Sequence, residues 1–182
     1  MRIISGSARG TKLVSLDSLD TRPTLDRVKE ALFSSITPYV SESVVLDLFA
    51  GSAALGLEAL SRGAKECDFI DNNKLAKQII ETNIKKTHME DKSSVYICDF
   101  LDFLDRCNKK YDLVFLDPPY ASDFVEKALK KLKPYLNGNA IVVAEVLKGT
   151  EFDYVGYEVL KEKSYGKVSI FTLTKELVWA KK

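Results

Sequence analysis

The sequence has little of what several classes of protein require. Its 182 residues include three cysteines, one histidine and one tryptophan. No apolar run reaches the roughly 18 residues of a membrane span. The first ten residues also lack an apolar stretch of signal-peptide length. We therefore expect a cytoplasmic protein with no membrane partner.

The cysteines are too few, and wrongly spaced, to form a covalent framework. Cys67, Cys98 and Cys107 contain no CxxC pair, and their number is odd. This pattern predicts reduced thiols, with neither disulfides nor a zinc site. The single histidine, His88, stands among charged residues and is expected at the surface. We therefore expect no metal cofactor.

An excess of charge of one sign is also missing. The 27 Lys and Arg residues oppose 26 Asp and Glu residues, which leaves a formal net charge of +1. Proteins that hold nucleic acid through a general basic field usually have a larger excess, so any such contact here must be local. With 46% hydrophobic residues, the chain suits one globular domain, which excludes disorder or a coiled coil throughout.

From about residue 44, short apolar runs alternate with segments of helical periodicity. The runs predict strands at residues 44–49, 67–71, 95–98, 111–117 and 140–146, and the segments between them predict helices. Apolar strands separated by helices indicate a parallel sheet covered on both faces. Residues 157–163 and 167–173 alternate polar and apolar side chains, which predicts an antiparallel hairpin at one edge. The predicted fold is α/β, with a doubly wound, mostly parallel sheet.

Residues 1–40 differ from the rest and predict an extension of the same domain, which spans residues 41–175 and leaves a tail at 176–182. The first twelve residues contain three cations and no acid, and a helix is predicted within residues 21–36. Its apolar face is expected to pack against the sheet. Cations in this extension are candidates for a local phosphate-binding patch. They are Arg9, Arg22 and Arg27.

A turn of small residues follows the first predicted strand. It begins at Asp47 and runs through Gly51 to Gly56. Such a turn lets backbone N–H groups approach a ligand closely, at the strand ends where parallel sheets bind ligands. The spacing is not GxGxxG, because Ala53 occupies the middle position, and this argues against a nicotinamide oxidoreductase. A purely structural turn remains an alternative.

Polar residues also follow the next two strands. Asp71 and Asn72 end the second strand, and Asp99 precedes Phe100 after the third. The Asp71 carboxylate can accept hydrogen bonds from both hydroxyls of a ribose. Asp99 can accept from an adenine amine while Phe100 flanks the ring. Each acid can instead cap the following helix, but the three strand ends together suggest a nucleoside-containing cofactor.

The most specific motif is Asp117-Pro118-Pro119-Tyr120, at the end of the fourth strand. The two prolines fix the backbone and remove two donors, so that the carbonyl of Pro118 stands beside the Asp117 carboxylate as a second acceptor. Two acceptors suit an exocyclic amine, whose lone pair is then turned from the ring toward an electrophile. Tyr120 offers a face on which a base can stack. A rigid turn after a buried strand is the alternative.

Two segments, VLDLFAGSAALGLEALSRGA and FLDPPY, resemble the class I S-adenosylmethionine-dependent methyltransferases that modify amino groups of bases. With MRIISGSARG and TRPTLDRVKEALF included, residues 1 to about 173 resemble the RsmD family of bacterial small-subunit ribosomal RNA guanine 2-amino methyltransferases. The resemblance implies a seven-stranded sheet whose last strand is antiparallel. It implies S-adenosylmethionine as cofactor, and a guanosine of small-subunit ribosomal RNA as substrate. That RNA would stand in an assembled or partly assembled subunit, among ribosomal proteins.

The resemblance also assigns roles to residues. The methionine part of the cofactor would approach Gly51, the ribose would meet Asp71, and the adenine would lie near Asp99 and Phe100. The full predicted cofactor set is Asp47, Phe49, Gly51, Ser52, Asp71, Asn72, Asp99 and Phe100. Asp117, Pro118 and Tyr120 would hold the target base. We predict direct transfer by a monomer, without metal or covalent intermediate. Ala53 replaces the family's usual glycine, and its methyl group could crowd the cofactor.

Other substrates and one other class remain open. The same motif serves adenine amines, and an Asn-Pro-Pro-Tyr motif serves a glutamine amide in release factors. A DNA enzyme would need a target-recognition insert, for which residues 120–140 leave little room. The amide enzymes have Asn where this chain has Asp117. A non-catalytic RNA-binding assembly factor on the same fold is the alternative outside enzymes.

Overall fold

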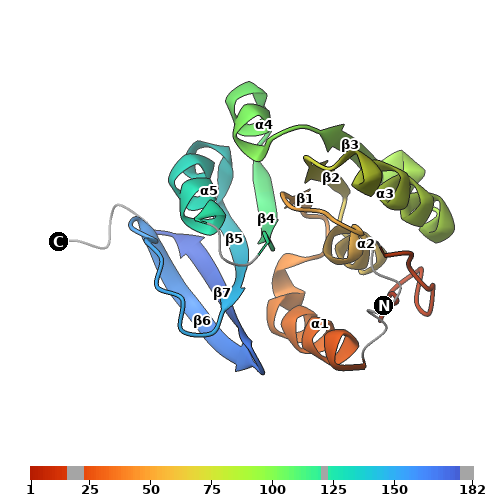
Figure 1. The fold of residues 1–182 in the computed structure, drawn as a ribbon, viewed down its shortest axis with the longest axis horizontal. Coiled ribbons are helices and arrows are strands. Elements are labelled where there is room, and N and C mark those ends of the chain that lie inside the picture. Colours follow the sequence, from red (N-terminus) through yellow and green to blue (C-terminus); the bar gives the residue numbers. More distant parts are fainter. Residues whose placement is uncertain (16–22, 120–122, 177–182) are drawn as a thin grey trace.

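The computed structural model describes residues 1–15, 23–119 and 123–176, and these residues form a single seven-stranded sheet flanked by helices (Figure 1). The sheet order is β3-β2-β1-β4-β5-β7-β6. The strands are β1 (Val44–Asp47), β2 (Glu66–Asp71), β3 (Ser93–Ile97), β4 (Tyr111–Leu116), β5 (Leu136–Leu147), β6 (Tyr157–Tyr165) and β7 (Val168–Lys175). The helices are α1 (Pro23–Ile36), α2 (Ala54–Ser61), α3 (Lys74–Thr87), α4 (Phe100–Arg106) and α5 (Phe124–Leu132).

The first five strands run parallel, and the direction reverses only at the end of the chain. β7 lies between β5 and β6 and pairs antiparallel with both. The predicted α/β fold, with its mostly parallel sheet and C-terminal hairpin, is therefore confirmed. The hairpin closes one edge of the sheet through its second strand, which leaves β6 at the outside with mostly exposed side chains.

Two apolar layers hold the helices to the sheet. On one face, residues such as Phe33 of α1 and Leu57 of α2 pack with Phe69 and Phe115 of the strands. On the other face, α4 and α5 pack against the remaining strand side chains. The central strands β1, β2 and β4 bury both of their faces, which is why they are nearly continuous in apolar residues. Among the described helices, none is long and apolar enough to cross a membrane.

Two local expectations differ from the structure. β5 begins at Leu136 rather than Ala140, because Leu136 pairs with Tyr111 before an irregularity shifts the register to Leu113 and Ile141. The apolar spacing of residues 74–86 predicts that Leu75 packs inward, but Leu75 lies in the first turn of α3 and is 63% exposed.

Candidate active site

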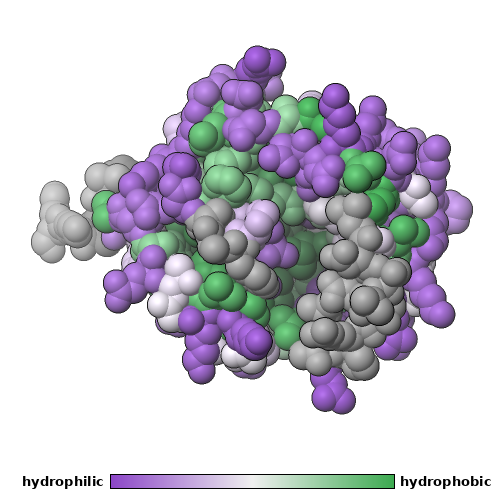
Figure 2. All heavy atoms as spheres, in the orientation of Figure 1, coloured by the Kyte–Doolittle hydropathy of each residue, from purple (hydrophilic) through white to green (hydrophobic). Residues whose placement is uncertain are grey.

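A cavity of about 500 Å³ opens at the carboxyl ends of the central strands. Its size lies in the range of roughly 300–1,000 Å³ typical of small-molecule sites. Three carboxylates and three aromatic rings dominate its walls. Its lining residues are Leu48, Phe49, Gly51, Asp71, Asn72, Cys98, Asp99, Phe100, Asp117, Pro118, Pro119 and Phe124. Figure 2 shows hydrophilic side chains over most of this face of the molecule, with apolar side chains exposed in the hollow near its centre.

The turn after β1 is held open by backbone conformation and by two acids. Gly51 has a φ of +54° and Ala53 a φ of +64°, both in the left-handed region. Asp71 accepts a hydrogen bond from the N–H of Gly51 at 2.8 Å, and Asp47 accepts one from the N–H of Gly56 at 3.0 Å. The turn is thus fixed from two neighbouring strands, and its Gly51 edge faces the cavity.

Ala53 carries the conformational cost of that turn. An alanine in the left-handed region is less favourable than a glycine by roughly 1–2 kcal/mol, because its Cβ approaches the following carbonyl oxygen. Ala53 is fully buried, whereas the cavity wall is formed by other residues of the turn. The glycine that the family resemblance leads us to expect at this position would therefore be favoured by the backbone, independent of any contact with a ligand.

Gly56 brings α2 close to the sheet. A Cβ atom at this position would lie 2.4 Å from the Phe69 ring and 2.7 Å from the Cys67 sulfur. Only glycine permits this approach, which places the start of α2 directly behind the turn.

Asp71 and Asp99 accept hydrogen bonds from backbone N–H groups of the protein, and both also line the cavity. Asp71 accepts from the N–H groups of Gly51 and Asn73, both at 2.8 Å, and Asn73 is the residue that caps α3. A carboxylate offers about four lone-pair positions, so two remain for a ligand. Asp99 caps α4 by accepting from the N–H of Leu101 at 2.8 Å through one oxygen. Asp99 can therefore cap α4 through one oxygen and contact a ligand through the other.

The aromatic wall consists of Phe49, Phe100 and Phe124. The rings of Phe49 and Phe124 are parallel, with centroids 6.0 Å apart. Phe100 tilts against both, at 5.0 Å from Phe49 and 5.4 Å from Phe124. Such a wall suits the flat face of a base, with Asp99 next to it.

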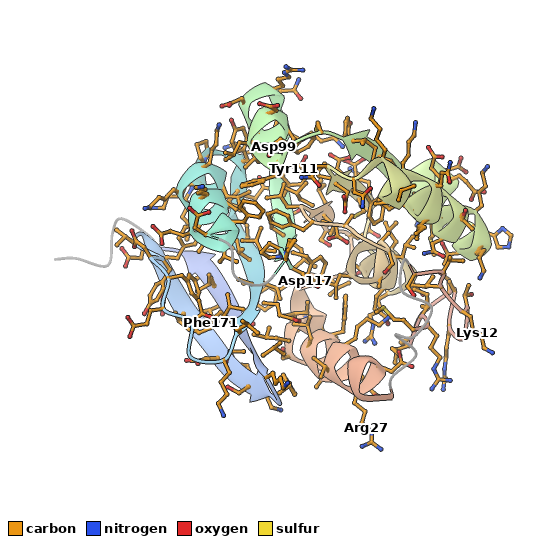
Figure 3. The ribbon with its side chains drawn as sticks, viewed as in Figure 1. Lys12, Arg27, Asp99, Tyr111, Asp117 and Phe171 are labelled. Atoms are coloured by element: carbon orange, nitrogen blue, oxygen red, sulfur yellow. The ribbon has the colours of Figure 1, made fainter. Side chains whose placement is uncertain are left out.

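Asp117 reaches the same cavity from the end of β4, as its position beside that strand in Figure 3 shows. Its side chain opens into the cavity, and Pro118 beside it is buried. Asp117 is exposed to the cavity but lies deep among protein atoms, and this desolvation raises the pKa of its carboxyl well above the usual range, as do the negative charges of Glu145 and Asp47. Burial likewise raises the pKa of Asp47 to about 7. Asp117 in the cavity and Asp47 beneath the turn therefore hold their protons more firmly than ordinary carboxyl groups.

Most of the predicted site residues meet in this one cavity. Those that line it are Phe49, Gly51, Asp71, Asn72, Asp99, Phe100, Asp117 and Pro118. Asp47 is 2% exposed and supports the turn from beneath, while Ser52 directs its carbonyl toward α3. Tyr120 lies outside the described residues.

Phe124 and Asn83 are absent from the predicted set. The apolar spacing of residues 123–133 predicts that Phe124 lies on the inner face of a helix, so nothing in the sequence separates it from a core residue. Asn83 is fully buried in α3, where it donates to the Ser52 carbonyl at 2.9 Å. The same amide accepts from the N–H of Val14 and donates to its carbonyl, both at 2.8 Å. An asparagine among apolar residues at helical spacing was the available signal.

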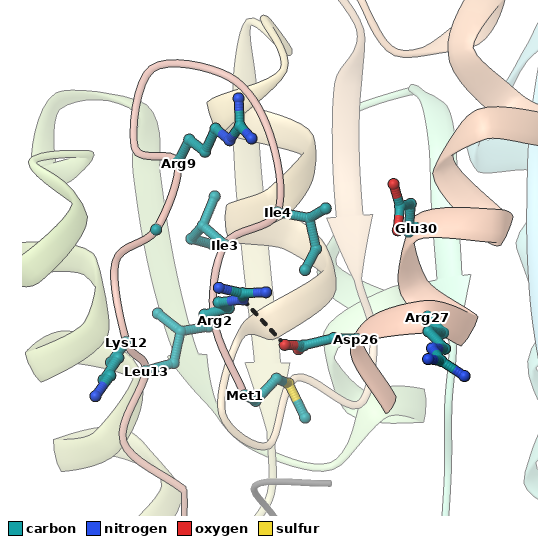
Figure 4. A pocket seen from close by; sticks show the side chains of 11 residues that line it. Met1, Arg2, Ile3, Ile4, Arg9, Lys12, Leu13, Asp26, Arg27 and Glu30 are labelled. Carbon is teal, nitrogen blue, oxygen red and sulfur yellow. Dashed lines mark hydrogen bonds and ion pairs between the residues drawn. The ribbon is translucent and has the colours of Figure 1, made fainter. Parts of the chain in front are cut away.

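A second hollow, of about 870 Å³, lies between the N-terminal segment (residues 1–14) and α1 (Figure 4). Its walls bear four cations, namely Arg2, Arg9, Lys12 and Arg27, and two acids, Asp26 and Glu30. Arg2 pairs with Asp26 across it at 3.2 Å. Arg9, Lys12 and Arg27 are exposed and form no ion pair with any described residue. Two of the three predicted phosphate contacts thus share one groove, while Arg22 lies outside the described residues.

A buried carboxylate anchors the N-terminal segment. Glu58 of α2 is fully buried and accepts from the N–H groups of Ile4 at 2.8 Å and Ser5 at 3.1 Å. It also pairs with Arg62 at 2.7 Å and with the buried Lys29 of α1 at 3.2 Å. Burial lowers the pKa of Lys29, which Glu58 partly offsets. One acid therefore joins the two walls of the groove.

The sheet order, the reversed last strand and the cavity at the strand ends define the fold of a class I methyltransferase. A family model described as "Conserved hypothetical protein 95" matches residues 1–174, and the chain belongs to this family, the RsmD family. The resemblance noted in the sequence is confirmed.

Individual relatives agree with that assignment. The Haemophilus influenzae protein named "Ribosomal RNA small subunit methyltransferase D" is 39% identical over 175 residues, which cover 93% of this chain and 91% of its own. The structure of yhhF from Escherichia coli superposes with a TM-score of 0.85 at 31% identity, over 97% of this chain and 98% of that one. SMU.776, solved in complex with SAH, shares the fold at a TM-score of 0.68 and 17% identity, over 81% of this chain and 48% of its own.

Proposed function

We propose that this protein transfers a methyl group from S-adenosylmethionine to the 2-amino group of a guanosine in small-subunit ribosomal RNA, within an assembled or partly assembled subunit. The observation that carries the proposal is that Asp117 and Pro118 line the same cavity as Asp71, Asp99 and Phe100. The proposed amine site would then lie next to the proposed nucleoside site. Membership of the RsmD family, and the name of the Haemophilus relative, support ribosomal RNA as the substrate.

The cavity suits S-adenosylmethionine in charge and shape. When bound, this cofactor supplies an electrophilic methyl group on a positively charged sulfur. Among the described residues, the cavity wall contains three carboxylates and no Lys or Arg, which favours a cationic ligand. The free lone pairs of Asp71 would accept from the ribose hydroxyls, and the second oxygen of Asp99 from the adenine amine. Gly51 leaves room for the methionine part of the cofactor, because it has no side chain and, apart from its two chain neighbours, no described residue has an atom within 4 Å of the position that its Cβ would take.

Asp117 and Pro118 would orient the target amine. The Asp117 carboxylate and the Pro118 carbonyl each accept one N–H, which turns the nitrogen lone pair toward the methyl group. The raised pKa of Asp117 makes its ionised form a good acceptor for the proton that the amine releases after transfer. The target base must leave its stack to reach this point, at a cost of a few kcal/mol. We expect Tyr120 to contribute to that exchange by stacking on the base.

The groove of the N-terminal segment would hold the RNA backbone. Arg9 and Arg27 lie on opposite walls and present exposed guanidinium groups, which pair well with phosphates. Lys12 adds a third exposed cation. These contacts fix position without reading sequence, so the shape of the ribosomal particle would supply the choice of site. We expect Arg22 to belong to the same patch.

Radiolabelled methyl transfer tests the proposal. Labelled S-adenosylmethionine is incubated with small subunits that lack native modifications, in parallel with naked ribosomal RNA and with DNA, and the products are digested to nucleosides. Label in N2-methylguanosine, the nucleoside methylated on its 2-amino group, is the expected result from ribosomal RNA. Label in adenine or in DNA would contradict the substrate assignment while leaving the amine site intact. Absence of label, with binding of the cofactor demonstrated, would favour a non-catalytic assembly factor.

A further inference from the structure

Glu145, an acid in the middle of the sheet, lies next to Asp117. Leu116, the last residue of β4, is paired with Ala144 of β5. Asp117 directly follows Leu116, and Glu145 directly follows Ala144. Neighbouring parallel strands lie about 4.8 Å apart, and residues in register project to the same face. The two carboxylates therefore stand side by side where β4 ends.

The electrostatics of Asp117 agree with this placement. Apart from burial, the negative charge of Glu145 is the strongest influence that raises the pKa of Asp117, ahead of Asp47. Two like charges act on each other in this way only when they are close together. The strand register therefore places Glu145 beside Asp117, and the charge interaction is consistent with this placement.

The sheet fixes the backbone of Glu145, and the surroundings of its side chain disfavour a charge. Its backbone pairs with Ile170 of β7 on one side, and on the other side its neighbour Ala144 is the last residue of β5 paired with β4, so its position is fixed by the sheet. Its neighbours Ala144 and Val146 are buried, and Glu145 itself is half-buried. A carboxylate among such neighbours carries a desolvation cost that a hydrophobic residue would avoid. A charge retained there beside Asp117 points to a role at the end of the sheet.

Guanine presents donors that match two adjacent carboxylates. Its Watson–Crick edge bears the N2 amine and, on the next ring atom, the N1–H. Adenine and 2-aminopurine have at N1 a lone pair in place of a hydrogen. A carboxylate facing N1 therefore attracts guanine and repels the other two, because two acceptors cannot share a hydrogen bond. The N–H dipoles of guanine would also offset the repulsion between Asp117 and Glu145.

We propose that Glu145 accepts the N1–H of the target guanine while Asp117 and the Pro118 carbonyl accept from its 2-amino group. Glu145 is then a specificity-determining residue, which selects guanine among purines that carry the same amine. This inference rests on the proposed function, since it concerns the base that the same site receives.

A purine that keeps the amine and lacks the N1–H tests the assignment. After the modified guanosine has been located by nucleoside analysis, small subunits are reconstituted with 2-aminopurine at that position by ligation of the RNA. Initial rates of methyl transfer are compared for guanine and 2-aminopurine in the parent protein and in Glu145→Gln. Glutamine keeps the size of the side chain and, with its amide turned over, can donate to the N1 of 2-aminopurine. Glu162→Gln, on the exposed edge strand β6, is the matched control.

The parent and the control should prefer guanine by at least about 100-fold, as sites built around a substrate N–H do. Glu145→Gln should reduce this preference by about tenfold or more, while its affinity for S-adenosylhomocysteine stays within about twofold. An unchanged preference in Glu145→Gln, even with a slower rate on both bases, would overturn the inference and leave Glu145 a structural role. Equal rates of the parent on both bases would overturn it as well. Failure of the proposed function is distinct, because the parent would then give no methylated guanine on unsubstituted RNA.

Discussion

The two hollows of this molecule are opposite in charge and are built in different ways. Of the residues that the structure describes, those that line the cavity at the strand ends include Asp71, Asp99 and Asp117 and no Lys or Arg. The groove of the N-terminal segment carries four cations against two acids. A net charge of +1 conceals this separation. A nearly neutral protein can therefore offer one site to a cationic cofactor and another to a phosphate backbone.

The construction of the two hollows differs as much as their charge. The cavity arises from strand ends and the short turns that follow them, so that its residues are close in sequence to the elements that position them. The groove depends on side chains from distant helices, above all Glu58 and Asn83, which bond to the backbone of the N-terminal segment. We expect substitutions in the cavity to affect chemistry and substitutions beneath the groove to affect stability.

The largest effect is expected from Asp117. Replacement by Ala removes one of the two acceptors for the target amine, and methyl transfer should fall by about 1,000-fold or more. Affinity for S-adenosylhomocysteine, measured by calorimetry, should change by no more than about twofold. Asp117→Asn keeps one acceptor oxygen and should lose less activity than Asp117→Ala. Normal turnover of the alanine variant would contradict the orienting role.

Glu58 should have the next largest effect, on the free energy of unfolding. Glu58→Gln removes the charge that compensates the buried Lys29, and it should destabilise the protein by about 3 kcal/mol. Urea denaturation measures the change. Glu81→Gln, in an exposed pair with Lys77, is the matched control and should cost less than about 0.5 kcal/mol. Equal stability of the two variants would mean that the groove does not depend on this anchor.

Asp47 should make stability depend on pH. Because its pKa is raised from 3.8 to about 7 in the folded protein, its contribution is complete below about pH 4 and is lost as the pH rises through 7. Asp47→Asn keeps an acceptor for the Gly56 N–H and removes this loss. Between pH 5 and pH 8, the variant should lose about 2 kcal/mol less of its unfolding free energy than the parent. Parallel pH curves for the parent, the variant and the exposed control Asp91→Asn would exclude the effect.

Arg9 and Arg27 should give the smallest of these effects. Charge reversal of both to Glu should weaken RNA binding by about tenfold at moderate salt, and should lower the slope of log affinity against log salt by about two. The fall in slope follows because fewer counterions are released. Filter binding over a salt series measures both quantities. Reversal of Lys161 and Lys167, which are exposed on the C-terminal hairpin and do not line the groove, changes the net charge equally and should leave both nearly unchanged.

The cavity was largely predictable from the sequence, because each of its polar residues directly follows a strand that can be recognised from the sequence. The apolar runs located the strands, and the polar residues after them had to meet at one edge of a parallel sheet. Asp71, Asp99 and Asp117 were found in this way. The left-handed conformation of Ala53 explains why glycine is usual there, a reason that the sequence alone did not supply.

The remaining parts depend on pairings that no local pattern encodes. Glu145 has its place only once β5 is registered against β4, and Glu58 is indistinguishable in sequence from a solvated acid on a helix. Phe124 faces the cavity because α5 starts beside Phe49, which the periodicity of α5 cannot show. The groove likewise exists only because residues 1–14 fold back onto α2 and α3.

Hydrogen–deuterium exchange with each ligand alone tests most directly whether the two hollows have separate ligands. S-adenosylhomocysteine should slow exchange at the backbone amides of residues 49–52, 71–73 and 99–101, and should leave residues 2–12 nearly unchanged. A fragment of small-subunit ribosomal RNA should slow exchange in residues 2–12 and 26–30. Protection of residues 2–12 by the cofactor analogue, or RNA binding that leaves both of those segments unprotected, would contradict the division between an anionic cofactor cavity and a cationic RNA groove.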